Sequence, residues 1–291
     1  MSARILSPSE TRRELERIRH QPDTRLGQNF LVDGNIVRKS VRLAAIQSGD
    51  VVVEIGPGLG TLTYALLEAG AIVYAIEFDR LLYQHLNDTM ASDFPDRLHL
   101  SQGDAVKVPL AGIPALYDGD FKIVANLPYA ISTPWMAAIL AGRLPQRMVL
   151  MLQAETASRL MAPHGCKNFS AISILLQSAY LPAESHRVSP NCFHPRPEVG
   201  STLIRMDLRP DPVRLAPESM DLIRGLFRKR RKQIGSLLRS VSPEVAAPFL
   251  ADLESAGLPP RTRPEAIPLA RWHQLDTIVR STGKPRDGKA M

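Results

Sequence analysis

Cysteine is scarce in this chain of 291 residues, which contains only Cys166 and Cys192. Neither belongs to a CxxC pair or has a histidine at zinc-binding spacing, so we expect reduced thiols, no disulfide scaffold and no metal site. Long apolar runs are missing too, because no stretch approaches the ~20 residues that span a bilayer. The first segment, MSARILSPSETRRELERIRH, is charged throughout and holds no apolar signal-peptide stretch. We therefore expect a cytoplasmic protein without membrane contact.

Acidic residues are outnumbered, because 29 Asp and Glu face 36 Lys and Arg, which gives a net charge of +7. A basic surface attracts polyanions, although a merely soluble basic protein would show the same total. The distribution favours nucleic acid: residues 224–239, RGLFRKRRKQIGSLLR, carry seven Arg or Lys and no acid, while the apolar residues keep a helical spacing. The pattern predicts a core-anchored helix with a cationic outer side that contacts phosphates, with a solvated face as the alternative. The cations that we assign to RNA binding are Arg228, Lys229, Arg230, Arg231 and Lys232.

Short apolar strands alternate with amphipathic helices from Gly34 to about Asp207, which predicts βαβ units and a mostly parallel sheet. The fold class is therefore α/β. The expected strands cover residues 51–55, 72–77, 98–102, 121–125, 148–152 and 202–206.

A break in this pattern predicts a second domain. Residues 209–212, RPDP, end the alternation, and the helical stretches near 218–240, 243–256 and 268–281 follow without a convincing strand. We expect an α/β domain over residues 26–208 and a small helical domain over residues 209–291. Residues 1–25 show no clear core pattern and are expected to form a flexible basic arm.

A glycine-rich turn follows the first expected strand, in the sequence EIGPGLGT from Glu54 to Thr61. Glycines such as Gly56 and Gly58 let a ligand approach the backbone closely at the carboxyl edge of a parallel sheet, where nucleotides bind. The spacing is GxGxG rather than the GxGxxG of dinucleotide folds, and Pro57 removes a backbone donor that a pyrophosphate would use. The turn therefore favours a less phosphorylated ligand.

Acidic residues end the next two expected strands. Glu77 closes the second, where a carboxylate can accept from both hydroxyls of a ribose, and Asp104 follows the third, where it can accept from an adenine amine. A ligand with ribose and adenine but no pyrophosphate describes S-adenosylmethionine. Each acid alone would also fit a helix cap or a solvated turn, but one shared pocket explains all of them together.

The stretch FKIVANLPYAISTPW places an amide, a proline and an aromatic at the end of a buried strand. The exocyclic amine of adenine is a poor nucleophile and must be oriented in line with a methyl donor. The side-chain oxygen of Asn126 and the carbonyl of Leu127 can accept its two hydrogens, Pro128 stiffens the turn, and Tyr129 can stack on the base. The alternative is a capped turn whose tyrosine packs on the core. We expect adenine methylation at this turn.

The motifs together resemble the rRNA adenine N6-dimethyltransferase family, and more narrowly its bacterial branch that modifies small-subunit (16S) rRNA. The resemblance runs in order from about residue 25 to about residue 272. It implies a Rossmann-like class I methyltransferase sheet with a small C-terminal helical domain, and four methyl transfers to two adjacent adenosines in a hairpin loop near the 3′ end of 16S rRNA. The motifs that carry it are RLGQNFL, EIGPGLGTLT, IEFD, QGDA, NLPYAIST, MLQAE, FHPRPEVGS, FRKRRKQIGSLL and RPE.

The resemblance also implies roles for residues that the chemistry alone does not single out. Asn29 and Leu31 would contact the methyl donor, as would Asn126, and Gly56 would line its methionine end. Phe193 would face Tyr129 across a flipped base, although taken alone it is typical of a core residue. Two departures concern the support of these loops: Ala130 stands where the family usually has Asn after NLPY, and Gly200 stands where it has Asp in PxVDS.

Three other functions remain open at this point. A 23S rRNA adenine methyltransferase that confers antibiotic resistance would share the core motifs. A small-subunit assembly factor with secondary catalysis would share the fold. An NAD-dependent oxidoreductase fits poorly, because the glycine spacing, Pro57 and the absence of a suitable catalytic His or Tyr-Lys pair count against it. The expected partner is 16S rRNA in the small ribosomal subunit or its precursor, and the expected state is a monomer.

Overall fold

The computed structural model describes residues 5–23 and 26–282, which divide into two compact units. The first comprises Met1–Ala157 and Leu181–Leu208, and the second comprises Ser158–Tyr180 and Arg209–Met291. The break after residue 208 lies where it was expected, but the segment Ser158–Tyr180, expected in the α/β domain, belongs to the helical unit. Its helix α7 (Ala171–Ala179) packs against α8 (Pro217–Arg228) and α11 (Leu269–Thr282), and within that packing the His273 imidazole Nε2 lies 3.0 Å from the Ser178 hydroxyl.

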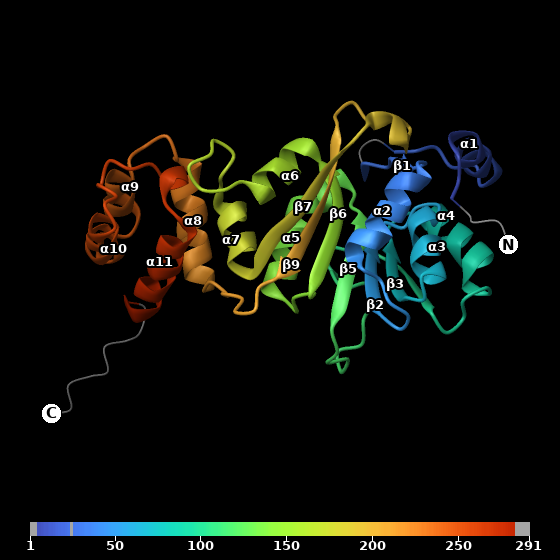
Figure 1. Ribbon diagram of the computed structural model, residues 1–291, viewed down its shortest axis with the longest axis horizontal. Coiled ribbons are helices and arrows are strands. Elements are labelled where there is room, and N and C mark those ends of the chain that lie inside the picture. Colours follow the sequence, from blue (N-terminus) through green and yellow to red (C-terminus); the bar gives the residue numbers. More distant parts are fainter. Residues whose placement is uncertain (1–4, 24–25, 283–291) are drawn as a thin grey trace. The chain divides into compact units, whose positions relative to one another are not determined.

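A seven-stranded sheet forms the core of the first unit and confirms the α/β fold class (Figure 1). Its strand order is β4-β3-β2-β5-β6-β9-β7, in which the first five strands are parallel neighbours and β9 runs antiparallel to β6. Continuous apolar runs such as VVVEI in β2 are buried on both faces, as central parallel strands require. The strands are β2 (Val51–Ile55), β3 (Ile72–Glu77), β4 (Leu98–Gln102), β5 (Phe121–Asn126), β6 (Arg147–Gln153), β7 (Tyr180–Val188) and β9 (Ser201–Leu208).

All six expected strands are confirmed, with ends that shift by two residues at most. Strand β7 was not predicted; it contains Pro182 and is mostly exposed, as suits a strand at the sheet edge. A two-stranded ladder of β1 (Phe30–Leu31) and β8 (Phe193–His194) was not predicted either; it pairs Phe30 with His194 and Leu31 with Phe193. This ladder joins two of the expected site segments.

The parallel register brings four strand ends to one edge of the sheet. Glu77 at the end of β3 lies opposite Gln102 at the end of β4, and Asn126 at the end of β5 lies opposite Met151 in β6. Because ligands of α/β sheets bind outside the carboxyl ends of parallel strands, the loops that follow β2, β3, β4 and β5 are the place for a site.

Helices alternate with these strands along the chain (Figure 1), and two of them begin with a side-chain cap. Asp33 accepts from backbone N–H groups at the start of α2, and Asp79 does so at the start of α4, which satisfies donors that a helix leaves unpaired. α2 packs against β5, β6 and β9, and α3 packs against β3. The helices are α2 (Gly34–Ala44), α3 (Thr61–Glu68), α4 (Arg80–Leu86), α5 (Ser132–Ala141) and α6 (Ala154–Met161).

The described part of the expected N-terminal arm is a capped helix with core contacts. α1 (Pro8–Arg17) begins with a capping box in which Ser7 and Glu10 bond each other's backbone N–H. Leu15 is only 4% exposed and belongs to a hydrophobic cluster with Phe30, Leu59 and Leu82. The expectation of a segment without a core pattern is therefore wrong for these residues. The rest of the arm, residues 1–4 and 24–25, lies outside the described residues.

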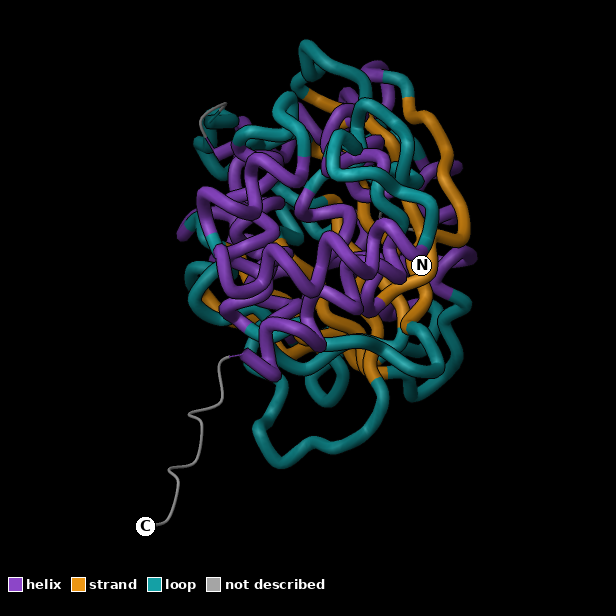
Figure 2. Tube along the Cα trace, turned by 90° about the vertical axis from the view of Figure 1, so that its left-hand side faces the viewer, coloured by secondary structure: helices purple, strands orange, loops and turns teal. Residues whose placement is uncertain are grey.

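The second unit is built from helices, as expected (Figure 2). Trp272 lies fully buried at its centre, where its ring is 5.6 Å from that of Phe227 and 6.0 Å from that of Phe249. Within residues 5–23 and 26–282, no helix combines the length and apolar character needed to cross a bilayer. The helices of this unit after α6 are α7 (Ala171–Ala179), α8 (Pro217–Arg228), α9 (Ile234–Val241), α10 (Pro243–Ser255) and α11 (Leu269–Thr282).

The single cationic helix expected over residues 224–239 is wrong. α8 ends at Arg228 and α9 begins at Ile234, so the basic residues of 229–232 lie in a turn between two helices. The backbone N–H of Ile234 donates to Thr262 (2.8 Å), and that of Gly235 donates to Pro260 (3.0 Å). The carbonyls of Thr262 and Pro260 thus accept from the first backbone N–H groups of α9. A new helix therefore begins at Ile234 instead of α8 continuing.

Candidate active site

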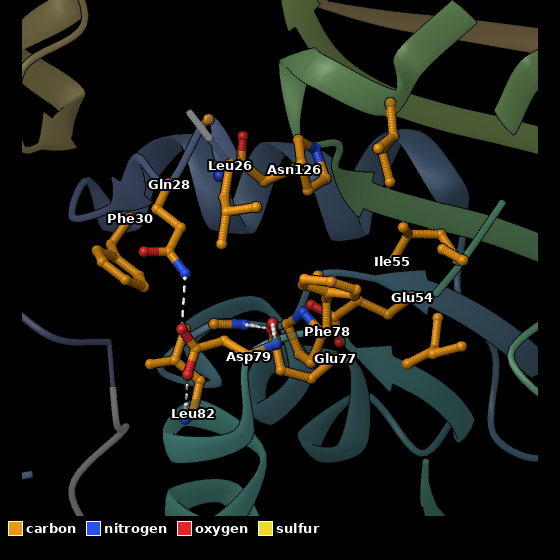
Figure 3. Close-up of a pocket in the computed structure, with 18 of the residues that line it drawn as sticks. Leu26, Gln28, Phe30, Glu54, Ile55, Glu77, Phe78, Asp79, Leu82 and Asn126 are labelled. Atoms are coloured by element: carbon orange, nitrogen blue, oxygen red, sulfur yellow. Dashed lines mark hydrogen bonds between the residues drawn. The ribbon is translucent and has the colours of Figure 1, made fainter. Parts of the chain in front are cut away.

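A cavity of about 380 Å³ opens at the carboxyl edge of the sheet in the first unit (Figure 3). Its walls come from the loops after β2, β3, β4 and β5 and from the segment around β1. The sequence-predicted residues that line it are Asn29, Leu31, Gly56, Gly58, Glu77, Asp104, Asn126 and Pro128.

The glycine turn after β2 forms one wall because a side chain would not fit there. Gly56 and Gly58 have φ angles of 65° and 62°, in the left-handed region that favours glycine. A Cβ on Gly56 would lie 2.9 Å from the Pro128 ring, and a Cβ on Gly58 would lie 3.0 Å from the Phe30 ring. The turn therefore brings bare backbone to the cavity and holds two other walls against it.

Glu77 is fixed at the end of β3 by two backbone donors. Its Oε2 accepts from the Gly58 N–H at 3.0 Å and its Oε1 accepts from the Asp79 N–H at 2.9 Å. The side chain is 5% exposed, and this burial raises its pKa above the ordinary value, while the backbone hydrogen bonds oppose the rise. The carboxylate is thus held rigidly at the cavity wall, where each oxygen has a second lone pair for a ligand hydroxyl.

Asp104 lies in the loop after β4, next to Gly103 in the cavity wall. Its Oδ1 accepts from the Val106 N–H at 2.8 Å, which fixes the carboxylate in its loop. The position fits the predicted contact with an adenine amine, which stays a prediction.

Asn126 has its amide orientation set by the segment that contains β1. Its Nδ2 donates to the backbone carbonyl of Asn29 at 2.9 Å, and the Asn29 side chain in turn donates to the Gly27 carbonyl at 3.1 Å. Because the amide nitrogen is committed to a carbonyl, the side-chain oxygen is the acceptor that Asn126 offers to the cavity. The structure thus brings Asn29 and Asn126 together, and their expected contacts with the methyl donor stay predictions.

The rest of the NLPY turn divides between cavity and core. Leu127 is 1% exposed, and its N–H donates to the Met151 carbonyl at 3.2 Å. Tyr129 is half-buried and does not line the cavity, whereas Ala130 does. The Tyr129 hydroxyl lies 2.6 Å from the hydroxyl of Ser201 at the start of β9. Ala130, where the family usually has Asn, leaves this rim of the cavity without a polar side chain.

Phe193 lies in the hydrophobic core rather than in the cavity lining. It is 3% exposed and shares a cluster with Leu31, Val188 and Leu203. The pairing of β8 with β1 places it beside the cavity wall, so its backbone supports the site. Its predicted role as a second stacking face stays a prediction, and its burial matches the core reading of the sequence.

Among the cavity residues without a sequence-predicted role, two stand out chemically. Glu54 lies within β2, is 1% exposed, and has a carboxyl oxygen without a hydrogen-bond partner among the described residues. Burial raises its pKa to about 8, and the nearby Glu77 carboxyl adds to the rise. The signal was the single acid in the apolar run VVVEI. Phe78, directly after Glu77, is 61% exposed at the cavity, which offers a flat apolar face to a ligand (Figure 3).

The N-terminal segment is tied to the cavity wall through Asp79. The His20 imidazole Nε2 lies 2.8 Å from Asp79 Oδ2, and the Gln28 amide donates to the same oxygen at 3.2 Å. The Gln28 amide oxygen accepts from the Asp23 N–H at 2.7 Å. Burial raises the pKa of Asp79, but the hydrogen bonds from His20, the Leu82 N–H and Gln28 outweigh it, so the pKa lies below its ordinary value. These hydrogen bonds therefore hold the wall formed by residues 26–31 in place.

The charged residues of the cavity indicate which ligand it fits. Four of its lining residues are acids, namely Glu54, Glu77, Asp79 and Asp104, and none of the lining residues that the structure describes is Lys or Arg. Such a cavity disfavours a pyrophosphate and suits a ligand with ribose, adenine and positive charge, as in S-adenosylmethionine. No group of three His, Cys, Asp or Glu is placed to hold a metal ion in the described ranges.

The basic turn of the second unit keeps most of its cations accessible. Arg228, Lys229, Arg231 and Lys232 are exposed, whereas Arg230 donates to the carbonyl of Lys167 at 2.6 Å. Four of the five predicted RNA-binding cations are thus available on the surface, and the fifth anchors the turn to its neighbouring loop.

The sheet order, the glycine turn and the acidic cavity define a class I methyltransferase. Residues 19–257 match the family described as Ribosomal RNA adenine dimethylase, and the chain belongs to that family. S-adenosylmethionine is the methyl donor of this class and family.

Related proteins match nearly the whole chain. A ribosomal RNA small subunit methyltransferase A from Opitutus terrae is 57% identical over 93% of this chain and 98% of its own length. Another, from Moorella thermoacetica, is 41% identical over 87% of this chain and 91% of its own.

Two solved structures share the fold. A dimethyladenosine transferase from Plasmodium falciparum superposes with a TM-score of 0.75 at 24% identity, covering 87% of this chain and 98% of its own. The 23S rRNA methyltransferase ErmE superposes with a TM-score of 0.66 at 20% identity, covering 87% of this chain and 100% of its own.

Proposed function

We propose that this protein methylates N6 of two adjacent adenosines in a hairpin loop near the 3′ end of 16S rRNA, giving N6,N6-dimethyladenosine in the small ribosomal subunit or its precursor. Support comes from relatives named small subunit methyltransferase A, at up to 57% identity. The observation that supports the proposal most directly is the orientation of the Asn126 side-chain amide. Its nitrogen is held by the Asn29 carbonyl, so its oxygen can orient an adenine amine beside the donor cavity.

The chain's residues orient the amine rather than activate it by a strong base. The Asn126 oxygen and the Leu127 carbonyl accept the two N6 hydrogens, which points the nitrogen lone pair at the donor cavity. When bound, S-adenosylmethionine would supply an electrophilic methyl group on a sulfonium, and the amine that accepts this group would be cationic. The two acceptors stabilise that cation, which then loses its proton to solvent.

The second transfer uses the same residues. A monomethylated amine keeps one hydrogen, so one of the two acceptors is enough to orient it. Tyr129 stacks on the base and holds its plane while the methyl group replaces a hydrogen. Around the donor, Glu77 binds the ribose, Asp104 binds the adenine, and Asn29, Leu31, Gly56 and Gly58 form the remaining wall.

The basic turn of the second unit contacts RNA phosphates. Its four exposed cations, in a loop between two helices, form a compact patch of like charge suited to a bent or looped backbone. The protein acts as a monomer in the cytoplasm.

Methyl transfer from labelled S-adenosylmethionine tests the proposal. Small ribosomal subunits that lack the modification and large subunits serve as parallel acceptors, with the modified nucleoside identified by mass. We expect dimethyladenosine on the small subunit alone, approaching four methyl groups per particle. Label on the large subunit would instead identify a 23S rRNA enzyme, and tight small-subunit binding without label would identify an assembly factor.

A matched pair of variants tests the role of the amide. Asn126→Ala removes the orienting oxygen and should abolish most of the label, whereas Asn87→Ala removes an exposed asparagine of the same unit and should leave it unchanged. Equal activity of the two variants would remove Asn126 from the mechanism.

A further inference from the structure

A hydrogen bond ties the NLPY turn to a distant strand of the same unit. The hydroxyl oxygens of Tyr129 and Ser201 lie 2.6 Å apart, although 72 residues separate them in the sequence. Either hydroxyl can donate. Neither Tyr129 nor Ser201 lines the donor cavity, so this contact lies outside the site described above.

Ser201 is held on the rigid side of this contact. It is 2% exposed and begins β9, where it pairs with Gln153 at the end of β6. The residue before it, Gly200, accepts a hydrogen bond from the Ala154 N–H at 2.9 Å. The backbone of the serine is therefore fixed by a sheet ladder on one side and by a backbone contact on the other.

Tyr129 needs such an anchor because its own element is short. It begins a single 3₁₀ turn, Tyr129–Ile131, with no side-chain cap. The turn packs closely against two glycines. A Cβ on Gly27 would lie 3.0 Å from the Tyr129 nitrogen, and a Cβ on Gly56 would lie 2.9 Å from Pro128. These contacts fix the backbone of the turn. The hydrogen bond at the far end of the ring adds a contact that fixes the side-chain rotamer.

We propose that Ser201 is a positioning residue that holds the ring of Tyr129 at the angle at which it stacks on the target adenine. The inference rests on the proposed function, in which Tyr129 is the stacking residue. Partial burial raises the pKa of Tyr129, so its hydroxyl stays protonated throughout the neutral range. A protonated, partly buried hydroxyl is costly to leave unpaired, which favours the anchored rotamer.

The serine, rather than the residue before it, is the functional member of the PEVGS segment. Gly200 has no heavy atom within 4 Å of an added Cβ, and its φ lies outside the left-handed region, so this position accepts a side chain freely. The departure from the family pattern at Gly200 therefore leaves the anchor intact, because Ser201 and its contact are present.

A double-mutant cycle tests the proposal. Ser201→Ala and Tyr129→Phe remove the same hydrogen bond from its two ends, and Tyr129→Phe keeps the ring and leaves no hole. The measurements are kcat and KM for methyl transfer to unmodified small subunits, the ratio of monomethyl to dimethyladenosine, the Kd for S-adenosylmethionine and the melting temperature. Ser40→Ala is the matched control, because it removes a serine hydroxyl that is also buried, at 3% exposure, and bonded to the Ile36 carbonyl.

If Ser201 positions Tyr129, each single variant lowers kcat about tenfold, raises the share of monomethyl product and leaves the Kd for the donor within about twofold. The kcat of the double variant is then also about tenfold below wild type, as for each single variant, and not about a hundredfold below. Ser40→Ala shifts the melting temperature by about as much as Ser201→Ala does, without changing kcat. A kcat within about twofold of wild type for Ser201→Ala, or multiplicative losses in the double variant, overturns the positioning role. A wild-type protein that does not methylate small subunits overturns the proposed function itself.

Discussion

Replacing Glu54 with glutamine should remove a pH dependence that this single carboxyl imposes on stability. Glu54 is 1% exposed, and burial raises its pKa to about 8 from an ordinary 4.5. The folded protein keeps this proton at pH values where the unfolded chain has already released it. The stabilisation is therefore complete below about pH 4.5 and is lost as the pH rises through about 8, at ~1.4 kcal/mol per pH unit.

Urea unfolding at about pH 5, 6, 7 and 8 measures this effect. From about pH 5 to about pH 7, the free energy of unfolding should fall by ~3 kcal/mol more for the wild type than for Glu54→Gln. Glu68→Gln, at an exposed position of the same unit, should follow the wild-type curve. Comparing variants at each pH cancels the contributions of groups that do not interact with residue 54. Parallel curves for wild type and Glu54→Gln would show that Glu54 is ionised in the folded protein and would refute the reasoning.

Three further perturbations follow from the site and the fold. Asn126→Ala should lower kcat by about 10² or more while the affinity for small subunits stays within about twofold, and equal losses in both would count against an orienting role. Neutralising the four exposed cations of the 228–232 turn with glutamine should weaken RNA binding and reduce its salt dependence, by about one unit of slope per phosphate contact; an unchanged slope would mean that these cations are only solvated. Gly60→Ala should destabilise the fold by ~2 kcal/mol or more, because its φ is 82° and a Cβ would lie 2.6 Å from Leu86. Gly112→Ala, with a φ of 84° and open space, measures the backbone strain alone, and equal losses in melting temperature would contradict the clash.

The sheet was predictable because its central strands are continuous apolar runs, and such runs specify buried parallel strands whatever their neighbours. β7 was not, since its sequence YLPAESHRV is mostly polar and exposed at the sheet edge, where neither alternation nor burial marks it. β1 and β8 are two residues each, too short for any periodic signal.

The helical errors have different physical causes. The break between α8 and α9 could not be predicted, because Arg and Lys are good helix formers and the apolar spacing continues across it. It depends on tertiary contacts from residues 260–262. In contrast, α1 carried a local signal: Ser7, Pro8 and Glu10 form an N-cap, a first-turn proline and a capping box.

The site was predictable where it depends on strand ends. Glu77, Asp104 and Asn126 all follow from the rule that parallel strands present their carboxyl ends at one edge. The sequence does not show how these side chains are held: the bond from Asn126 to Asn29, and that from Tyr129 to Ser201, join segments far apart in the chain. Phe193 shows the opposite limit, because a core phenylalanine and a stacking phenylalanine look alike in sequence.

The ladder between β1 and β8 has a consequence for the order in which the protein folds. It pairs residues 30 and 31 with residues 194 and 193, across most of the first unit. Closing so long a loop costs chain entropy before any contact repays it, and during synthesis β8 leaves the ribosome long after β1. The wall of the cavity that contains Asn29 therefore pairs with β8 late, after the central strands have paired. A nascent chain that lacks residue 194 has to hold this wall without the ladder, through contacts such as those of Asn29 with Asn126 and of Gln28 with Asp79.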